Sequence, residues 1–205
     1  QQKLTAPNGD EFGEFGFSAS MSTDGKTAFI GAPADGSAHV FSKTGGEWTQ
    51  QQRLTPPDGE ESDDFGIELS VSGDGTTVII SESDGDPQET QPGGVYVFTE
   101  SGGEWSYQQK LTVPDGEVQD DFGQSLAISG DGTVVFIGSS DDENPNGEQA
   151  GSAYVFTNSG GEWIRQQKLL AEDGDSADTF GVSAAISDNG TTALIGASTD
   201  GNPNG

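Results

Sequence analysis

The sequence has no cysteine, few basic residues, few large aliphatic residues and no long apolar run. Without cysteine, a disulfide framework, a thiolate metal site and a cysteine nucleophile are all excluded. The longest apolar runs, such as VVFI at 134–137, are far shorter than the ~20 residues that a membrane-spanning helix needs. No charged and then apolar leader precedes Gln1, so we expect a secretion signal to be absent from this segment or already removed.

Acidic residues dominate the charge, with 35 Asp and Glu against 7 Lys and Arg and a formal net charge of -28. Phe, Leu, Ile and Val make up only about a fifth of the chain, and this poverty together with high net charge is typical of disorder. The acids, however, are spread along the whole length between short apolar runs, which predicts a folded protein with an acidic surface. We expect neither nucleic acid nor an anionic membrane as a partner. Such a surface also resembles those of salt-adapted proteins, in which salt screens the repulsion between acids.

A long unit repeats four times along the chain. QQKLT at 1–5 returns as QQRLT at 51–55, QQKLT at 108–112 and QQKLL at 166–170. A Phe-Gly pair steps by the same intervals of 50, 57 and 58 residues. Its copies are Phe15-Gly16, Phe65-Gly66, Phe122-Gly123 and Phe180-Gly181. The period therefore belongs to whole structural units.

Each unit is predicted to form four short strands. The first alternates, as in FGIELSVS, and ends at an Asp-Gly or Asn-Gly hairpin turn. The second (TAFIG, TVIIS, VVFIG, ALIGA) is apolar throughout, which predicts burial on both faces. The third carries a ring at His39, Tyr96 or Tyr154. The fourth begins at Trp48, Trp105 or Trp163 and reaches a leucine six residues later, so we expect the indole and the leucine on one face of a polar outer strand.

These features predict an all-β fold, a β-propeller built of four-stranded antiparallel blades. We divide the single array at 1–205 into the outer strand of a preceding blade at 1–6, blades at 12–56, 62–113 and 119–171, and a partial blade at 177–205. Three complete blades and parts of others indicate a fragment of a larger propeller of about seven blades. A four-bladed ring closed by the N-terminal strand is the alternative.

Phe-Gly at the start of a unit and Gly-Ala-Pro at 31–33 are the residues that resemble the FG-GAP repeat, the blade unit of integrin α-subunit propellers. The linking W…QQKLT and the stretch before each Phe-Gly are similar to the prokaryotic and haloarchaeal type. The later units depart from the motif, with SES, GSS and GAS at 81–83, 138–140 and 196–198. The calcium loop that the family carries between the first two strands is replaced here by short hairpins such as SGDGTT, so that metal site is not carried over.

A different calcium site is predicted between the second and third strands. DENPNG supplies Asp142, Asn144 and Asn146, and DGNPNG supplies Asp200, Asn202 and Asn204. Alternating oxygen side chains closed by glycine match the first half of a calcium-binding loop, although Ala153 replaces the acid expected at its twelfth position. Because Asn-Pro-Asn-Gly is equally a turn sequence, Ca²⁺ and a simple loop both stay open. No other cofactor is expected.

No catalytic residue is predicted. The single histidine, His39, occupies a position where the other units have tyrosine, which favours a packing role. Paired acids such as Asp63-Asp64, Asp120-Asp121 and Asp141-Asp142 should lie around a ring and not converge on one cleft. The nucleophile and phosphate-binding motifs of common enzymes are also missing.

The function predicted is therefore a non-enzymatic extracellular scaffold, secreted or on a cell surface, for protein interaction or cell adhesion. Its expected partners are a protein or glycan at a cell surface, or another copy of the chain. The longest loops between second and third strands, at 84–94 and 141–151, are the predicted contact region. The alternatives are a structural repeat in a surface layer or filament, and a sugar-binding or hydrolytic propeller that uses the channel or an additional domain.

Overall fold

A computed structural model describes residues 1–6, 13–57, 64–82, 93–114, 116–117, 120–199 and 201. The first sheet contains β1 (Ala19–Met21), β2 (Thr27–Ala32), β3 (Ser37–Thr44) and β4 (Glu47–Leu54), with a short 3-10 helix, η1 (Pro33–Asp35), after β2. The second contains β5 (Leu69–Val71), β6 (Thr77–Glu82), β7 (Gly94–Ser101) and β8 (Glu104–Leu111). The third contains β9 (Phe122–Ile128), β10 (Val134–Ser139), β11 (Ser152–Ser159) and β12 (Glu162–Leu169). A last pair is formed by β13 (Phe180–Ile186) and β14 (Ala193–Ala197).

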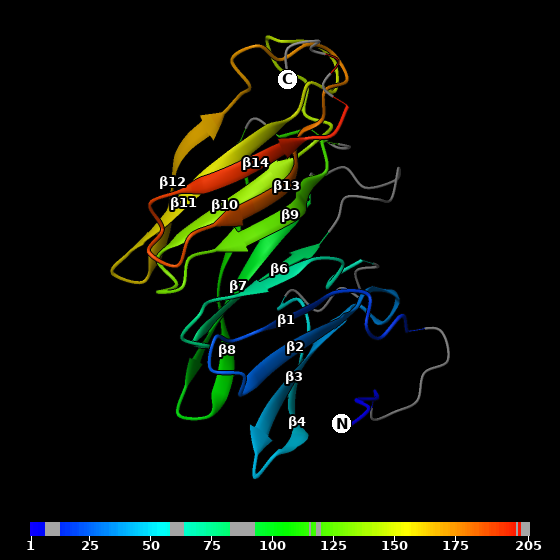
Figure 1. Cartoon of the computed structure of the whole chain (residues 1–205), viewed down its shortest axis with the longest axis vertical. Coiled ribbons are helices and arrows are strands. Elements are labelled where there is room, and N and C mark those ends of the chain that lie inside the picture. Colours follow the sequence, from blue (N-terminus) through cyan, green and yellow to red (C-terminus); the bar gives the residue numbers. More distant parts are fainter. Residues whose placement is uncertain are drawn as a thin grey trace.

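Each sheet is an antiparallel meander in which the strands pair in chain order. The sheets follow one another through the molecule, from the blue first blade to the red last pair (Figure 1). The inner strands β1, β5, β9 and β13 are neighbours in that order, as are the outer strands β4, β8 and β12. This arrangement confirms the predicted all-β class of four-stranded antiparallel blades. The described part of the chain contains no helix long and apolar enough to cross a membrane.

The acidic side chains of the predicted hairpin turns accept hydrogen bonds within the turns. Ser22 Oγ donates a hydrogen bond to Asp24 Oδ1 over 2.8 Å, and the backbone N–H of Lys26 donates to the same oxygen over 2.9 Å. Gly25 follows with φ +67°, the left-handed conformation that such a turn needs. These hydrogen bonds, led by the one from Ser22, lower the pKa of the Asp24 carboxyl. The same bonding recurs at Asp74, Asp131 and Asn189, so these side chains belong to turns.

The hydrophobic core lies between the blades. One cluster joins Phe29, Val40 and Leu54 of the first blade to Leu69 and Trp105 of the second. A second cluster joins the second and third blades in the same way and includes Ile79, Leu111 and Trp163. Stacking thus buries faces that no single sheet could cover, which is why a chain with so few large apolar residues can fold.

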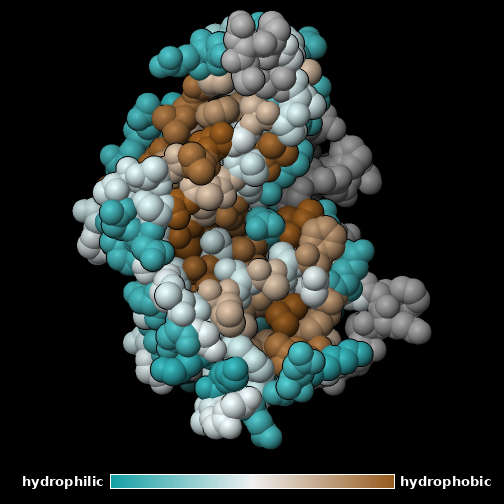
Figure 2. Space-filling model, in the orientation of Figure 1, coloured by the Kyte–Doolittle hydropathy of each residue, from teal (hydrophilic) through white to brown (hydrophobic). Residues whose placement is uncertain are grey.

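The second strand of a blade is buried on both faces when it has two neighbours. In β6, Val78 and Ile80 belong to the cluster toward the first blade, and Ile79 belongs to the cluster toward the third. In β14 the equivalent of Phe29 is Leu194, which is 73% exposed, whereas Phe29 is fully buried. Figure 2 shows brown apolar surface over the region where Figure 1 places β13 and β14. The apolar second strand therefore depends on a following blade for its burial.

Phe-Gly and Gly-Ala-Pro form a contact between neighbouring blades. A Cβ placed on Gly31 would lie 2.0 Å from the carbonyl oxygen of Gly66, and one placed on Gly66 would lie 2.6 Å from the carbonyl oxygen of Ser37. Gly66 also has φ +98°, a conformation that side chains rarely adopt. Gly138 and Gly181 repeat the close contact between the third and fourth units. The motif glycines therefore allow the backbones of two blades to approach closely.

In the three four-stranded blades, the phenylalanine of the Phe-Gly pair packs edge-on against the ring of the third strand. The ring centroids of Phe15 and His39 are 5.2 Å apart, and those of Phe65 and Tyr96 are 5.4 Å apart. Phe122 meets Tyr154 at 5.5 Å with the same tilt. This edge-to-face geometry is favourable for aromatic pairs. His39 accordingly occupies the position of an aromatic packing residue.

The repeated Gln-Gln pair has two separate roles on the outer strand. In β4 the ladder to β3 passes from Gln50 to Gln52, so Gln51 forms a bulge, and β8 and β12 have bulges at the equivalent place. The extra residue reverses which face the following side chains occupy. Trp105 consequently faces the first blade while Leu111 faces the third. The prediction that the indole and the leucine share a face was wrong for this reason.

The second glutamine of the pair joins the outer strands of neighbouring blades. Gln52 Nε2 donates to the carbonyl oxygen of Trp105 over 2.8 Å, and the N–H of Trp105 donates to Gln52 Oε1 over 2.9 Å. Gln109 makes the same pair of bonds with Trp163, and Gln2 makes it with Trp48. Residues 1–6 form no strand in this structure, and their assignment to a preceding blade stays a prediction that the Gln2 contact supports.

Replacing Gln52 by alanine should lower the free energy of unfolding by about 1–3 kcal/mol, because two inter-blade hydrogen bonds are lost and the Trp105 backbone groups lose their partners. Gln51→Ala is the matched control, since among the described residues the Gln51 side chain bonds only to Thr49 on its own strand. Urea denaturation followed by circular dichroism measures both. Equal effects of the two substitutions would contradict the inter-blade role.

Candidate functional site

A ring, a cation and an acid come together at the same place in each complete blade. In the third blade, Lys168 Nζ lies 2.9 Å from Asp142 Oδ1, and the Tyr154 hydroxyl donates to the same oxygen over 3.3 Å. The second blade repeats this with Lys110, Glu82 and Tyr96, and the first has Arg53, Asp35 and His39. The Lys168 ammonium also lies 5.4 Å from the Tyr154 ring centroid. The recurrence indicates a structural group of the blade.

The third blade has the most buried version of this group. The Asp142 side chain is 1% exposed, and its Oδ2 has no hydrogen-bond partner within the described residues. Asp120 is buried nearby, and its carboxylate accepts a hydrogen bond of 2.6 Å from the N–H of Glu117. Burial, together with the negative charge of Asp142, raises the pKa of Asp120 to about 6. The positive charge of Lys168 thus offsets the negative charge of the acids that are buried between these loops.

The predicted calcium ligands of the third unit are directed to protein partners. Asp142 is paired with Lys168, Asn144 Nδ2 donates to the carbonyl oxygen of Gly151, and Asn144 Oδ1 accepts from the N–H of Asn146. Asp142 Oδ2 is the one carboxylate oxygen of this set without a partner. Within the described ranges, no group of three or more His, Asp or Glu side chains could hold a metal ion. These three residues therefore do not form an oxygen cage, and calcium binding stays a prediction.

Other predicted site residues fall partly outside the described structure. Asp200, Asn202 and Asn204 lie outside the described residues, as does most of the predicted contact loop at 84–94. The loop at 141–151 is described, and it folds back through an isolated bridge between Asn144 and Gly147. Asp142 of this loop belongs to the ring, cation and acid group, so the loop is anchored on its own blade.

His39 is buried between the Phe15 ring and polar partners. Its Nε2 lies 3.2 Å from Ser37 Oγ, and its Nδ1 lies 3.0 Å from Gln50 Nε2. Burial lowers the pKa of His39 and the positive charge of Arg53 lowers it further, while Asp35 opposes this shift. The folded protein therefore favours the neutral imidazole.

This pKa shift predicts a loss of stability on acidification. Because the pKa is lower in the folded state, the unfolded chain takes up the proton first as the pH falls below about 6.5. The contribution of neutral His39 is present above that pH and is lost as the pH falls further. His39→Tyr, which installs the residue of the sister blades, should remove this part of the pH dependence. Urea denaturation of both proteins between about pH 5 and 8 measures the difference, and parallel curves would contradict the expectation.

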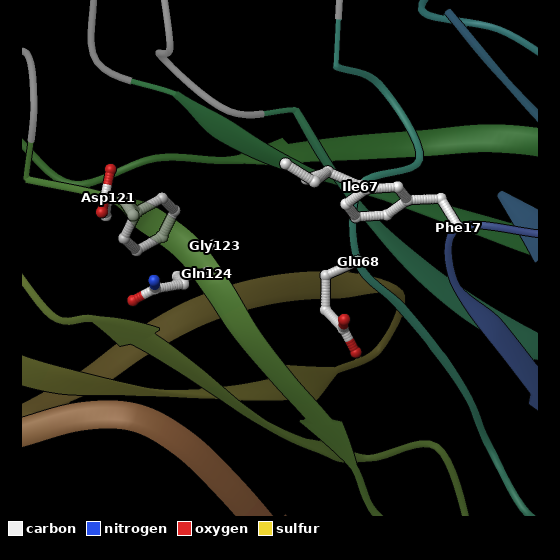
Figure 3. A pocket seen from close by; sticks show the side chains of 7 residues that line it. Phe17, Ile67, Glu68, Asp121, Gly123 and Gln124 are labelled. Carbon is white, nitrogen blue, oxygen red and sulfur yellow. The ribbon is translucent and has the colours of Figure 1, made fainter. Parts of the chain in front are cut away.

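A cavity of about 370 Å³ lies where three blades begin. It is lined by Phe17, Ile67, Glu68, Asp121, Phe122, Gly123 and Gln124. Figure 3 shows Phe17, Ile67 and Glu68 on one side and Asp121 and Gln124 across from them. This cavity was not predicted from the sequence. The available signal was Glu68, which stands where the other units have Ser18, Ser125 and Ser183.

The repeat units match a known family. The FG-GAP repeat family matches residues 48–98, 105–156 and 163–205, which is most of the chain. The chain belongs to the FG-GAP repeat family, and the motif contacts described above are the inter-blade contacts of its repeats. No curated protein matches the chain.

Several solved structures are similar to this chain in fold, and one of them is a β-propeller domain. The Swd1 β-propeller domain from Myceliophteria thermophila has a TM-score of 0.55 and 10% identity over 82% of this chain and 46% of that one. Hydrazine synthase from Kuenenia stuttgartiensis has a TM-score of 0.58 and 15% identity over 95% and 45% of the two chains. Sqt1 from Saccharomyces cerevisiae has a TM-score of 0.54 and 13% identity over 82% and 38%. The chain spans less than half the length of each, and the likeness concerns the fold.

Proposed function

We propose that this chain is part of a non-enzymatic β-propeller scaffold for protein interaction, secreted or displayed on a cell surface, with cell adhesion as its role. Membership of the FG-GAP repeat family supports the scaffold. The observation that carries the non-enzymatic assignment is the structural use of reactive side chains. Asp24 closes a turn, His39 packs edge-on against the Phe15 ring, and the Lys168 ammonium pairs with the Asp142 carboxylate. Each of these roles recurs in other blades, as a scaffold requires and a single catalytic cleft does not.

Bead adhesion tests the proposal directly. Beads coated with the chain are passed over surfaces that carry purified cell-surface proteins or glycans, and they are also mixed with one another. We expect retention on a protein surface or clumping of the coated beads, with bare beads and beads coated with unfolded chain as controls. Release of product from a sugar or lactone substrate, without adhesion, would overturn the scaffold in favour of an enzyme.

We also propose that the acidic surface is an adaptation to high salt. The net charge of -28 opposes compaction through repulsion between acids, and added salt screens this repulsion. Thermal melting should therefore show a rise in Tm as NaCl increases from about 0.05 M to 1 M, where the screening length falls to roughly 3 Å. An equal Tm at both concentrations would contradict the adaptation.

A further inference from the structure

We propose that the cavity at the starts of the inner strands binds an alkylammonium group, with Glu68 as its counter-ion and Phe17 as an apolar wall. The cavity is built from three blades, because its lining comes from the segments that enter β1 and β5 and from the start of β9. It exists only in the stacked array. The inference rests on the proposed scaffold function and gives that function a ligand class.

Glu68 breaks the symmetry of the repeat at this position. In the first unit, Ser18 Oγ donates to the carbonyl oxygen of Gly66 over 2.7 Å, and Ser125 Oγ makes the same bond to Gly181. Both bonds tie a blade to the one that follows. A carboxylate has no proton to donate in this way at neutral pH. The second unit therefore lacks this contact and has an acid facing the cavity (Figure 3).

A change on the second strand accompanies the change at Glu68. Ser81 replaces the glycine that stands at Gly31 and Gly138, and its hydroxyl accepts a bond of 3.1 Å from the N–H of Glu68. The same hydroxyl donates to the carbonyl oxygen of Glu68 over 3.3 Å. The Glu68 backbone is thus held by its own blade. Its side chain is left without a structural role in the described contacts.

The Glu68 carboxylate has no compensating charge within the described structure. No hydrogen bond or ion pair is formed by its oxygens among the described residues, and burial is the sole cause that raises its pKa. A half-buried negative charge without a partner is costly. A cation bound beside Glu68 would neutralise this charge, and the cost removed would favour binding. Asp121 lies across the cavity from Glu68.

The apolar part of the lining selects the kind of cation. Ile67 borders the cavity, and Phe17 beside it is 58% exposed. Such walls suit an alkyl chain, and an aromatic face also attracts an ammonium group. A calcium ion needs about six to eight oxygen ligands, which these side chains cannot supply. Anions are disfavoured by the net charge of -28. An amine with a short alkyl chain fits both parts of the lining.

Calorimetric titration with n-butylammonium chloride, against matched NaCl, tests the proposal. Because n-butylammonium has only five heavy atoms, it should bind weakly, with a Kd of about 1 mM. Glu68→Ser, which restores the residue of the other three units, should weaken binding at least about tenfold. Phe17→Ala should weaken it by a factor of about three to ten. Glu47→Ser changes the net charge equally at an exposed site and should leave the affinity unchanged.

A lysine-containing peptide distinguishes the two sources of the ammonium group. Binding of Gly-Lys-Gly as tight as butylammonium supports a lysine side chain of a partner protein, and binding of butylammonium alone supports a free amine. Absence of saturable heat up to about 20 mM amine, or equal affinity of Glu68→Ser and the parent, overturns the site. Thermal melting verifies that each variant is folded. If beads adhere but no amine binds, this inference fails and the scaffold stands; if amine binds without adhesion, the scaffold's adhesive role fails instead.

Discussion

Replacing Gly66 by alanine should lower the free energy of unfolding by about 2–6 kcal/mol, one of the largest effects expected of any single substitution in this chain. Two causes add together. The residue has φ +98°, where a side chain costs about 1–3 kcal/mol. The new Cβ would also lie 2.6 Å from the carbonyl oxygen of Ser37, and overpacking of this kind costs about 1–3 kcal/mol.

Gly16 provides the matched control for Gly66. It stands at the same place in the first unit, with φ +101°, but a Cβ there would meet no atom of the described residues within 4 Å. Gly16→Ala therefore carries the backbone strain without the inter-blade collision. Urea denaturation followed by circular dichroism should show Gly66→Ala to be the more destabilising by about 1–3 kcal/mol. Equal losses would mean that close approach of the blades has no part in the role of the Phe-Gly motif.

Replacing Trp105 by alanine should cost about 3–5 kcal/mol, because a large buried ring is lost from the boundary between two blades. Trp105 is 7% exposed and meets Phe29 of the first blade edge-on, with the ring centroids 4.8 Å apart. The substitution removes this aromatic contact and leaves a cavity beside a fully buried Phe29. The Gln52 hydrogen bonds to the backbone of residue 105 can persist, so the measured loss reports the side chain.

Trp48 is the control for this substitution. It occupies the same position on β4 and keeps the equivalent backbone bonds to Gln2, but its side chain is only half-buried. Trp48→Ala should cost roughly half as much as Trp105→Ala, or less, because less apolar surface leaves contact with protein. Chemical denaturation by circular dichroism is preferable to fluorescence, since each variant loses an indole. A loss at Trp48 as large as that at Trp105 would contradict the assignment of the core to the spaces between blades.

The sequence predicts the units and their strands well, because both depend on short-range chemistry. Asp24-Gly25 and its counterparts form the expected hairpins, since the turn needs a left-handed glycine and a nearby hydrogen-bond acceptor. The apolar run of β6 is buried on both faces as predicted. The aromatic position of His39 follows from its tyrosine counterparts and is confirmed by the Phe15 contact. Because these features recur from unit to unit, a single sequence is enough to predict them.

The arrangement of the outer strand was harder to predict, because a bulge is not evident from residue spacing. Trp105 and Leu111 are six residues apart, which in a regular strand places them on one face. The bulge at the first glutamine of the pair reverses this, and the two side chains contribute to different cores. The second glutamine reaches the next blade for the same reason. An alternation rule applied along one strand cannot anticipate either result.

The candidate site depended still more on tertiary contacts. The half-motif at Asp142, Asn144 and Asn146 predicts calcium by spacing, but the fold pairs Asp142 with Lys168, which is 26 residues away. The cavity around Glu68 collects residues from three blades, and nothing in their local sequence shows that they meet. Only the comparison of the units with one another makes Glu68 stand out.

By itself the sequence determined that this is an all-β array of FG-GAP blades, since turn chemistry, strand periodicity and a long repeat are all local properties of the chain. The tertiary structure decided how the blades meet. It placed the motif glycines of neighbouring blades in contact, joined Gln52 to Trp105, directed Trp105 and Leu111 to opposite cores, and opened the cavity at Glu68. These features depend on the distance and orientation between sheets, which the packing of buried side chains sets.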